Sequence, residues 1–269
     1  MIASLVNGRP GDRIAILDRG LQYGDGLFET IAVVDGRPAL WKRHLDRLAL
    51  GCRQLGIPMP DADLLRTEAE RLIGDRTTAI LKLVVTRGVG GRGYGPPADA
   101  EPTRILQLFD WHGPEGRPLA LRICRQRLGI QPGLGGLKHL NRLEQVLARR
   151  ECPQGEGLLL DTEGFVVEGI ASNLFLLVQG RLHTPLIDRC GVAGVVRELV
   201  LEKARQAHQP VVVRRILPQE LEEAEGLFLT SSLLGVVPVD ELDGEARAVN
   251  IRHHPLLEEV ADLAFKEHG

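Results

Sequence analysis

Two hydrophobic periods alternate along this chain from one end to the other, which restricts it to a mixed α and β fold. Phe28–Val34 has the length and composition of a strand, and the Asp35-Gly36 pair that follows is typical of hairpin turns. Trp41–Leu55 instead carries apolar residues at helical spacing and is followed by Gly56 and Pro58, which end helices. Both halves of the chain combine these two patterns.

The same patterns predict the remaining elements and one domain boundary. Strands are expected at 13–17, 28–34, 78–86, 103–109, 119–125, 157–161, 165–168, 173–178, 181–184, 210–216, 226–230 and 235–239. Helices are expected at 41–55, 61–73, 138–151, 193–207, 218–224 and from Pro255. Asp110–Pro118 is rich in turn-forming residues, so we expect domains at 1–112 and 113–269.

Composition excludes several classes of function. The net charge of −3 gives no electrostatic footprint for nucleic acid or an anionic membrane. No apolar run approaches the roughly 20 residues of a membrane-spanning helix, and the N-terminus lacks the pattern of a secretion signal. The four cysteines are far apart and do not combine with histidines at metal-ligand spacing. We therefore expect buried free thiols, a cytoplasmic protein and no metal site.

Lysine is scarce, with five lysines against twenty-eight arginines, so each lysine is a candidate for chemistry that arginine cannot perform. A guanidinium stays charged, whereas an amine can attack a carbonyl or move a proton. Lys138 follows a glycine-rich segment and precedes the polar His139 and Asn141, at the predicted start of a helix. It is either a reactive amine or a surface lysine of a first helical turn. Lys82 is expected to be the outward side chain of a half-buried strand.

Three separate features have the chemistry of one anion site. Glycines precede the helix predicted at 193–207, so the amides of Val195 and Val196 would point at a phosphate. Thr230–Ser232 follows a predicted strand and would offer hydroxyls and amides. Arg47 would offer a bidentate contact. Taken singly, these features have plainer interpretations, namely loop glycines, a turn and a surface salt bridge.

An acid and a glycine-rich loop complete the set of candidates. Glu168 closes a predicted strand and is either an exposed strand end or a held carboxylate; beside a pyridine nitrogen, it would keep that nitrogen protonated. The segment 88–97 is too rich in glycine for regular structure, and its Arg92 and Tyr94 would suit a carboxylate-bearing substrate. The alternative is a disordered hairpin tip. A lysine, a carboxylate and a divided phosphate site are the groups that pyridoxal 5'-phosphate requires.

The candidates also form an ordered set of motifs. In chain order these are Asp18–Thr30, His44–Arg47, Lys138, Glu168–Asn173, Gly194–Arg197 and Thr230–Ser232. The set spans nearly the whole chain and resembles the class-IV pyridoxal phosphate enzymes, a family that includes branched-chain and D-amino acid aminotransferases and aminodeoxychorismate lyase. The segments 86–94 and 137–148 resemble the lyase branch of that family.

The resemblance implies a fold and a set of roles. The fold is fold type IV, with a small α+β N-terminal domain, a larger α/β barrel-like C-terminal domain and the cofactor between them. Lys138 forms the Schiff base with pyridoxal 5'-phosphate, and Glu168 pairs with its pyridine nitrogen. The phosphate ligands are Arg47, the amides of Val195 and Val196, Ser231 and Ser232. The substrate is a small molecule with expected contacts from Phe28, Arg92, Tyr94 and Asn141, and the protein is a homodimer.

The lyase branch implies one reaction, but two alternatives stay open. The implied reaction converts 4-amino-4-deoxychorismate to 4-aminobenzoate and pyruvate, for folate biosynthesis. An aminotransferase acting on D-amino or branched-chain amino acids would use the same lysine. However, Phe28 stands where D-amino acid aminotransferases have a tyrosine, so their roles do not carry over at that position. A non-catalytic protein that binds the cofactor is the other alternative, and the presence of both Lys138 and Glu168 argues against it.

Overall fold

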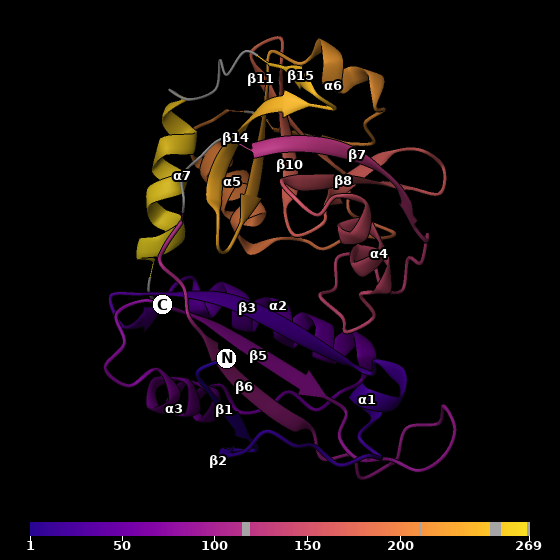
Figure 1. The fold of residues 1–269 in the computed structure, drawn as a ribbon, viewed down its shortest axis with the longest axis vertical. Helices are drawn as coiled ribbons and strands as arrows, with labels where there is room; N and C mark the ends of the chain where they lie inside the picture. Colours follow the sequence, from indigo (N-terminus) through magenta and orange to yellow (C-terminus); the bar gives the residue numbers. More distant parts are fainter. Residues whose placement is uncertain (115–118, 210, 248–253, 268–269) are drawn as a thin grey trace. The chain divides into compact units, whose positions relative to one another are not determined.

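The computed structural model describes residues 1–114, 119–209, 211–247 and 254–267, which form two compact units (Figure 1). The first unit consists of Met1–Gly113, Lys138–Asn141 and Phe265–Gly269. The second consists of Pro114–Leu137 and Arg142–Ala264. The domain boundary expected at 112/113 stays a prediction. The units are not divided by a single boundary, because Lys138–Asn141 and the last residues belong to the first unit. Of the predicted turn Asp110–Pro118, residues 115–118 lie outside the described part.

A six-stranded antiparallel sheet with the order β2-β1-β6-β5-β3-β4 forms the centre of the first unit. Its strands are β1 (Ala3–Val6), β2 (Arg9–Pro10), β3 (Gly26–Val34), β4 (Arg37–Pro38), β5 (Ala79–Thr86) and β6 (Thr103–Phe109). The hairpin turn predicted after β3 is confirmed, since Asp35 and Gly36 both have positive φ, at 51° and 74°.

Two amphipathic helices pack on this sheet, α2 (Trp41–Leu55) against β3 and α3 (Ala62–Ile73) against β1, β5 and β6. Gly51 lies in the middle of α2, where a Cβ would stand 2.8 Å from the side chain of Leu27 in β3. A glycine inside a helix costs about 1 kcal/mol relative to alanine. Here it permits the close approach of α2 to the sheet.

The strand predicted at 13–17 is wrong. Ile16 and Leu17 are exposed and belong to a turn that leads into the short helix α1 (Arg19–Tyr23). Asp18 caps α1 by accepting a hydrogen bond from the Gly20 amide. The turn at Ile16–Leu17 and the cap at Asp18 direct the backbone into α1. Residues 13–17 therefore pair with no strand, despite their apolar composition.

The second unit is built on nine strands, eight of them in the order β12-β11-β10-β13-β14-β7-β8-β9 with β15 beside β14. Their bounds are β7 (Leu119–Leu128), β8 (Glu156–Asp161), β9 (Val166–Gly169), β10 (Asn173–Val178), β11 (Arg181–Pro185), β12 (Val211–Arg214), β13 (Gly226–Ser231), β14 (Gly235–Leu242) and β15 (Glu245–Ala246). The pairs β7/β8, β7/β14 and β11/β12 are parallel and the other pairs are antiparallel.

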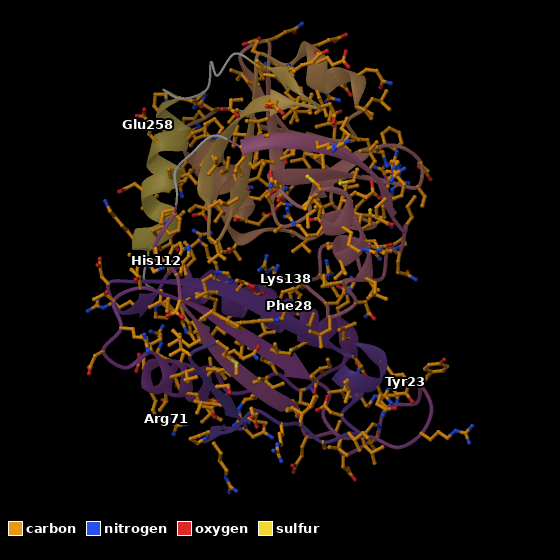
Figure 2. All side chains as sticks on the ribbon, in the orientation of Figure 1. Tyr23, Phe28, Arg71, His112, Lys138 and Glu258 are labelled. Atoms are coloured by element: carbon orange, nitrogen blue, oxygen red, sulfur yellow. The ribbon has the colours of Figure 1, made fainter. Side chains whose placement is uncertain are left out.

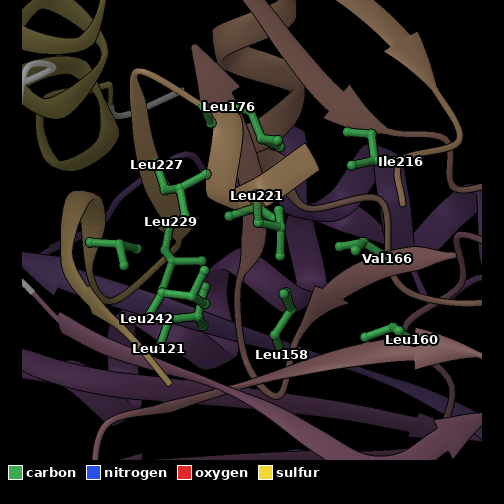
Figure 3. Packing of buried hydrophobic residues seen from close by; sticks show 13 residues of the cluster. Leu121, Leu158, Leu160, Val166, Leu176, Ile216, Leu221, Leu227, Leu229 and Leu242 are labelled. Carbon is green, nitrogen blue, oxygen red and sulfur yellow. The ribbon is translucent and has the colours of Figure 1, made fainter. Parts of the chain in front are cut away.

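The two ends of this sheet meet. Ile216, just after β12, forms a bridge with Val166 in β9, in which the Val166 amide donates to the Ile216 carbonyl at 2.9 Å. The sheet therefore curls around on itself, and its concave side holds a cluster of leucines that includes Leu121, Leu158 and Leu229 (Figure 3). A curled sheet leaves few free strand edges.

The helices after β7 are α4 (Leu143–Glu151), α5 (Val195–Gln206), α6 (Gln219–Glu223) and α7 (Pro255–Lys266). α4 packs against β7 and β8 and α5 against β12 and β13, whereas Leu221 of α6 belongs to the leucine cluster. On β10 and β13, Phe175 and Phe228 alternate with the core leucines and stack at 4.8 Å on the face toward α5. The four cysteines are free and buried, as predicted. No helix of the described residues is long and apolar enough to span a membrane.

Candidate active site

Lys138 lies on an extended segment that pairs with the beginning of β3. The Phe28 amide donates to the Lys138 carbonyl at 2.9 Å, and the Leu140 amide donates to the Gly26 carbonyl at 3.0 Å. The prediction that a helix starts at 138 is wrong, because α4 begins at Leu143. Pairing with β3 satisfies the backbone of this segment, which outweighs the helical spacing of its apolar residues.

The pairing places the Lys138 amine over an aromatic ring. Its Nζ lies 4.5 Å from the centroid of the Phe28 ring. Figure 2 labels both residues, which lie next to each other. A second amine, Nζ of Lys82 in β5, lies 5.5 Å from the same centroid. Both distances are within the range of a cation–π contact. Phe28, expected as a substrate contact, is therefore in contact with the candidate catalytic amine.

The glycines before Lys138 have a specific structural reason. Gly136 has a φ of 81°, and its amide and carbonyl pair with Gly191 and Ala193. A Cβ on Gly135 would stand 2.7 Å from the Arg189 amide nitrogen. A close backbone approach therefore requires glycine here.

On the opposite face of β3, a buried carboxylate is paired with two bases of α2. Glu29 is 1% exposed; its carboxylate lies 2.6 Å from Nδ1 of His44 and accepts from Nε of Arg47 at 2.9 Å. Burial alone raises the pKa of Glu29, but the charge of Arg47 and the hydrogen bond from His44 outweigh it and lower the pKa to about 2. Burial lowers the pKa of His44.

This cluster changes the context of Arg47. The guanidinium predicted to bind phosphate donates to Glu29, and its role toward a phosphate stays a prediction. Sequence reasoning did not single out Glu29 or His44. The signal was present, because Glu29 interrupts the apolar positions of β3, while His44 and Arg47 are three residues apart on one helix face.

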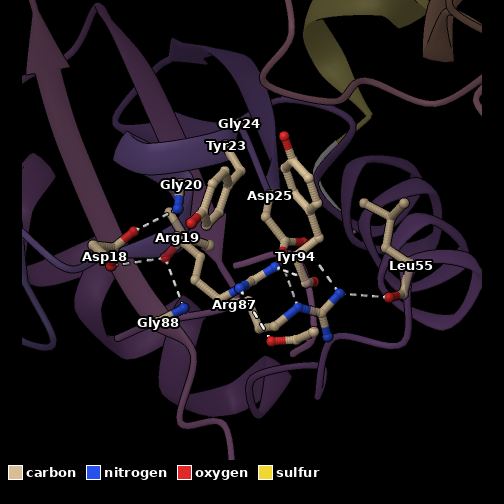
Figure 4. A network of polar contacts seen from close by, with 12 residues as sticks. Asp18, Arg19, Gly20, Tyr23, Gly24, Asp25, Leu55, Arg87, Gly88 and Tyr94 are labelled. Carbon is tan, nitrogen blue, oxygen red and sulfur yellow. Dashed lines mark hydrogen bonds and ion pairs between the residues drawn. The ribbon is translucent and has the colours of Figure 1, made fainter. Parts of the chain in front are cut away.

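A second polar network ties the start of the chain to the glycine-rich loop (Figure 4). Buried Asp18 accepts from the hydroxyls of Thr86 and Thr103, at 3.0 and 2.7 Å. Its neighbour Arg19 pairs with Asp25 at 2.8 Å, and Arg87 pairs with the same carboxylate at 2.7 Å. Sequence reasoning did not predict this network.

Arg19 also holds the loop that carries Arg92 and Tyr94. Its guanidinium donates to the carbonyls of Gly93, Tyr94 and Gly95 at 3.0, 2.9 and 3.4 Å. The Gly93 amide donates to the Tyr23 hydroxyl at 3.1 Å, and the rings of Tyr23 and Tyr94 meet edge to face. With these carbonyls turned toward Arg19, the side chains of Arg92 and Tyr94 are exposed. Their substrate contacts stay predictions.

Asn141 lies beside the end of α1. Its amide nitrogen donates to the carbonyl of Gly24, the left-handed C-cap of that helix, at 3.2 Å. A Cβ at Gly24 would stand 2.5 Å from Oδ1 of Asn141. Asn141 therefore packs tightly against this turn, and its contact with a substrate stays a prediction.

In the second unit, Glu168 lies near the end of β9 and is 4% exposed. Its carboxylate accepts from the Val192 amide at 2.7 Å, and the Val192 carbonyl accepts from the side chain of Asn173 at 2.9 Å. Gly191, with a φ of 78°, has no space for a Cβ, which would stand 2.7 Å from the Val167 side chain. Glu168 is thus the held carboxylate of the two alternatives, not an exposed strand end.

The same loop leads into the N-terminus of α5. Gly194 is the N-cap, and a Cβ there would stand 2.0 Å from Oδ1 of Asn173. Asn173 is paired across the sheet with Thr230, whose hydroxyl is buried and has no hydrogen-bond partner among the described residues. The first amides of a helix also have no partner within the helix. Val195 begins that helix, so unpaired donors and a hydroxyl gather at one end of the second unit.

The predicted residues therefore fall into two groups. The first unit holds Phe28, Arg47, Arg92, Tyr94, Lys138 and Asn141, and the second holds Glu168, Val195, Val196, Ser231 and Ser232. Ser231 ends β13, and its hydroxyl accepts from the Leu234 amide at 3.1 Å. Among the described residues, no cluster of histidine, cysteine or acidic side chains suits a metal ion.

These groups have definite chemical capacities. The end of the second unit suits a phosphate, through the α5 amides and the unsatisfied Thr230 hydroxyl, and a protonated ring nitrogen, through Glu168. The first unit supplies an amine that can bond to a carbonyl and carry a proton. Sequence reasoning included the Thr230–Ser232 hydroxyls in the anion site, whereas it named Asn173 only as the end of the Glu168–Asn173 motif.

Comparison with known proteins gives a consistent family. Residues 26–242 match the model of the amino-transferase class IV family. The chain is 34% identical to the aminodeoxychorismate lyase of Vibrio harveyi, over 91% of this chain and 93% of that protein. It is 33% identical to a putative branched-chain-amino-acid aminotransferase of Methanocaldococcus jannaschii, over 88% of this chain and 85% of the other.

A solved relative agrees with the fold. The crystal structure of 4-amino-4-deoxychorismate lyase from Pseudomonas aeruginosa is 46% identical, covers 96% of this chain and 97% of its own, and superposes with a TM-score of 0.87. The predicted fold type IV, with mixed α and β units and a barrel-like second sheet, is confirmed. On the motifs, the fold and these relatives together, the chain belongs to the amino-transferase class IV family.

Proposed function

We propose that this chain is a pyridoxal 5'-phosphate-dependent lyase that converts 4-amino-4-deoxychorismate to 4-aminobenzoate and pyruvate. The observation that carries the proposal is the 46% identity, over 96% of the chain, to the P. aeruginosa enzyme of that name. The geometry of both units supports it, because each presents part of what such a lyase requires.

The described residues fit the cofactor. In the second unit, the Val192 amide holds the Glu168 carboxylate, which would accept a hydrogen bond from the protonated ring nitrogen. The phosphate would bind at the Val195 and Val196 amides. The buried Thr230 hydroxyl, unsatisfied among the described residues, and the neighbouring Ser231 and Ser232 would donate to the same phosphate. Arg47 and the covalent ligand Lys138 come from the first unit.

The reaction needs one proton carrier. When bound, the cofactor withdraws the electron pair that is released at the reacting carbon. The Lys138 amine removes the proton from C4 of the substrate, the C3–O bond breaks, and the ring becomes aromatic. The same amine returns the proton to the departing enolpyruvate, which becomes pyruvate. Hydrogen and electrons balance without an oxidant or a second substrate.

Three further features complete the proposal. Arg92 and Tyr94, on the loop held by Arg19, bind a carboxylate of the substrate, and Phe28 and Asn141 contribute to its pocket. The protein acts as a homodimer in the cytoplasm and supplies 4-aminobenzoate for folate biosynthesis. The exclusion of nucleic-acid and membrane partners rests on the net charge of −3 and the absence of long apolar runs.

The decisive experiment is an assay without an amino acceptor. Purified protein loaded with cofactor is given 4-amino-4-deoxychorismate and no 2-oxo acid, and 4-aminobenzoate and pyruvate are measured. We expect both products in equal amounts. Absence of both, together with amino transfer from D-alanine or leucine to 2-oxoglutarate, would replace the lyase by an aminotransferase. The M. jannaschii relative, 33% identical, is the observation that keeps this second activity in the test.

A further inference from the structure

The helix α2 places a second base beside Arg47. His44 and Arg47 are three residues apart on this helix, and both contact one carboxylate oxygen, Oε2 of Glu29, at 2.6 and 2.5 Å. The two contacting nitrogens, Nδ1 of His44 and Nη2 of Arg47, are therefore no more than about 5 Å apart. An anion that binds Arg47 thus comes close to the imidazole of His44.

The hydrogen bonds of His44 determine which of its nitrogens can accept a proton. Glu29 is ionised, because its pKa is about 2, and a carboxylate only accepts, so Nδ1 of His44 donates to it. Burial lowers the pKa of His44, so the ring is neutral and Nε2 has a lone pair. Among the described residues Nε2 has no hydrogen-bond partner, although the side chain is fully buried. Nε2 is therefore the atom that takes a further proton.

The charged groups around His44 make its protonation sensitive to an incoming anion. These groups are Glu29 from β3, Arg47 from the same helix, and Lys138 from the segment that pairs with β3. Glu29 opposes the effect of burial and raises the pKa of His44, whereas Arg47 and Lys138 lower it. A phosphate at Arg47 adds about two negative charges, and these favour the protonated imidazole.

We infer that His44 is a second phosphate ligand, which takes up a proton at Nε2 when the cofactor binds and donates a hydrogen bond from that nitrogen to the phosphate beside Arg47. This inference rests on the proposed function. The proton comes from the solvent, and the N–H bond is the only bond formed. Two cations then hold the phosphate, and Glu29 holds the side chains of both. Without an anion the imidazole stays neutral, which avoids a second buried positive charge beside Arg47.

The test is the number of protons that accompany cofactor binding. The full chain is titrated with pyridoxal 5'-phosphate by calorimetry, in two buffers of different ionisation enthalpy, at about pH 6.5, near the ordinary pKa of histidine. The parent is compared with His44→Asn, which keeps a donor at the position of Nδ1 and loses the titrating group. Protons exchanged at Lys138 are common to both proteins and cancel. We expect the parent to take up more protons, by up to about one per chain.

The affinity for the cofactor should show the same dependence. At about pH 6.5 we expect His44→Asn to bind pyridoxal 5'-phosphate about 10-fold more weakly than the parent, since a charge-assisted hydrogen bond is lost. At about pH 9 the imidazole is neutral with or without the cofactor, so the difference should largely disappear. A purely structural role of His44 would weaken binding equally at both pH values, and that result would contradict the inference.

Further measurements separate the possible failures. His183→Asn replaces a histidine of β11 that is bound to Arg214 in the second unit, and it should take up as many protons as the parent. If His44→Asn does not fold, the parent is titrated with pyridoxal 5'-phosphate and with pyridoxal, which lacks the phosphate. Greater proton uptake with the phosphate supports the inference, and equal uptake overturns it.

The outcomes also distinguish this inference from the proposed function. Equal proton uptake by the parent and a folded His44→Asn would overturn the role of His44 and leave the lyase proposal standing. A parent that binds no pyridoxal 5'-phosphate and forms no 4-aminobenzoate overturns the proposed function and the inference with it.

Discussion

Glu29 shows how a single buried acid is kept ionised in this fold. Its carboxylate is enclosed between β3 and α2, where burial alone would favour the neutral form. Arg47 and His44 reverse that preference by offering donors at hydrogen-bonding distance. The Glu29 carboxylate in turn holds the side chains of His44 and Arg47 of α2 against β3, the strand that carries Phe28. Replacing one partner of such a cluster leaves the others buried without compensation.

The Glu29 cluster predicts a loss of stability in acid. The pKa of Glu29 is about 2 in the folded protein against an ordinary value of 4.5, so the stabilisation is complete above about pH 4.5 and is lost as the pH falls toward 2. The pKa difference corresponds to about 3 kcal/mol. Urea unfolding at pH 7, 5, 4 and 3 measures it. Glu29→Gln should lose about 3–5 kcal/mol at pH 7 and show a flatter acid dependence; an acid dependence equal to the parent's would contradict the prediction.

Lys138 predicts a spectroscopic outcome that does not depend on turnover. Only an amine forms a covalent bond with the cofactor aldehyde, so Lys138→Arg keeps the charge and loses the bond. Borohydride should fix the cofactor on the parent chain at the peptide containing Lys138, as read by mass spectrometry. Lys138→Arg and Lys138→Ala should remain unlabelled, whereas Lys42→Met should be labelled as the parent. Labelling of another lysine in Lys138→Arg would reassign the role.

Sequence alone made Lys138 and Glu168 candidates for roles that stay predictions, and it did not predict the contacts around them. Each of the two also had a plain structural interpretation, and it was the ordered set of motifs that assigned them roles. Glu29 and Asn173 were not singled out as site residues. Their importance depends on which residues face each other across a sheet or a helix, and one sequence gives no such pairing.

Among the elements, the loop 88–97 depends on a residue far from it in sequence. Arg19 donates to three successive carbonyls of that loop, so a residue outside the loop holds its backbone in place. Arg87 shares the Asp25 carboxylate with Arg19 but donates to the Leu55 and Gly56 carbonyls instead. Both arginines pair with Asp25, but only Arg19 also binds the loop, so variants of the two can distinguish these roles.

Removing the anchor should open the loop. We expect Arg19→Met to raise the rate of trypsin cleavage after Arg92 by about tenfold or more, because local opening no longer breaks three charge-assisted hydrogen bonds. If Arg92 binds substrate, KM should rise more than kcat falls. Arg87→Met loses the same acid partner and should leave the cleavage rate near that of the parent. Equal cleavage of Arg19→Met and parent would show that the loop is held by other contacts.

The N-terminus of α5 predicts the effect of one methyl group. Gly194→Ala would put a Cβ 2.0 Å from Oδ1 of Asn173, so Asn173 or the first turn of α5 must shift. We expect a loss of about 1–3 kcal/mol in unfolding free energy and weaker binding of pyridoxal 5'-phosphate, measured by urea unfolding and by cofactor titration. Gly91→Ala is the matched control, since no atom lies within 4 Å of its added Cβ. Unchanged cofactor affinity in Gly194→Ala would remove this helix end from the phosphate site.

Periodicity predicted most long elements, and it was wrong where another interaction overrode it. The strand β3 and the helix α2 occur where expected because turn-forming residues bound them, and the turn after β10 occurs at the Gln179-Gly180 pair that predicted it. The run 13–17 has a strand-like composition but no partner strand, and the start of α4 is displaced by pairing of Lys138–Leu140 with β3. Long-range pairing is invisible to a local period.

At the scale of the whole molecule, the first unit is completed by segments from three parts of the chain. Besides Lys138–Asn141, it includes the end of α7, where Phe265 lies against Trp111. The Leu40 amide donates to the Glu267 carbonyl at 2.7 Å, and Arg43 pairs with the Glu267 carboxylate at 2.9 Å. No turn signal or composition shift marks such a discontinuous unit, which is why a single boundary was predicted.

A chain that ends at Ala264 tests this dependence. Without Phe265 to Glu267, the Leu40 amide loses its acceptor and the first turn of α2 loses an ion pair. Hydrogen exchange should show faster exchange of Leu40. The amide of Ala39 is an internal control, because it donates to the Ala32 carbonyl within the same unit. Exchange at Leu40 equal to that of the full chain would mean that the last residues do not stabilise α2.

The contacts between α2 and the end of α7 can form only late in the synthesis of the chain. Arg43 and Glu267 are 224 residues apart in the chain. At the usual pace of translation of about 5–20 residues per second, roughly 10 to 45 seconds pass between their syntheses. For the first part of that interval, the nascent first unit lacks the segment Lys138–Leu140, which pairs with the beginning of β3. For the whole interval it lacks Glu267, which holds the start of α2. Until residues 138–140 are made, the edge of β3 at Gly26–Phe28 is unpaired, which is the condition in which strand edges associate with other chains.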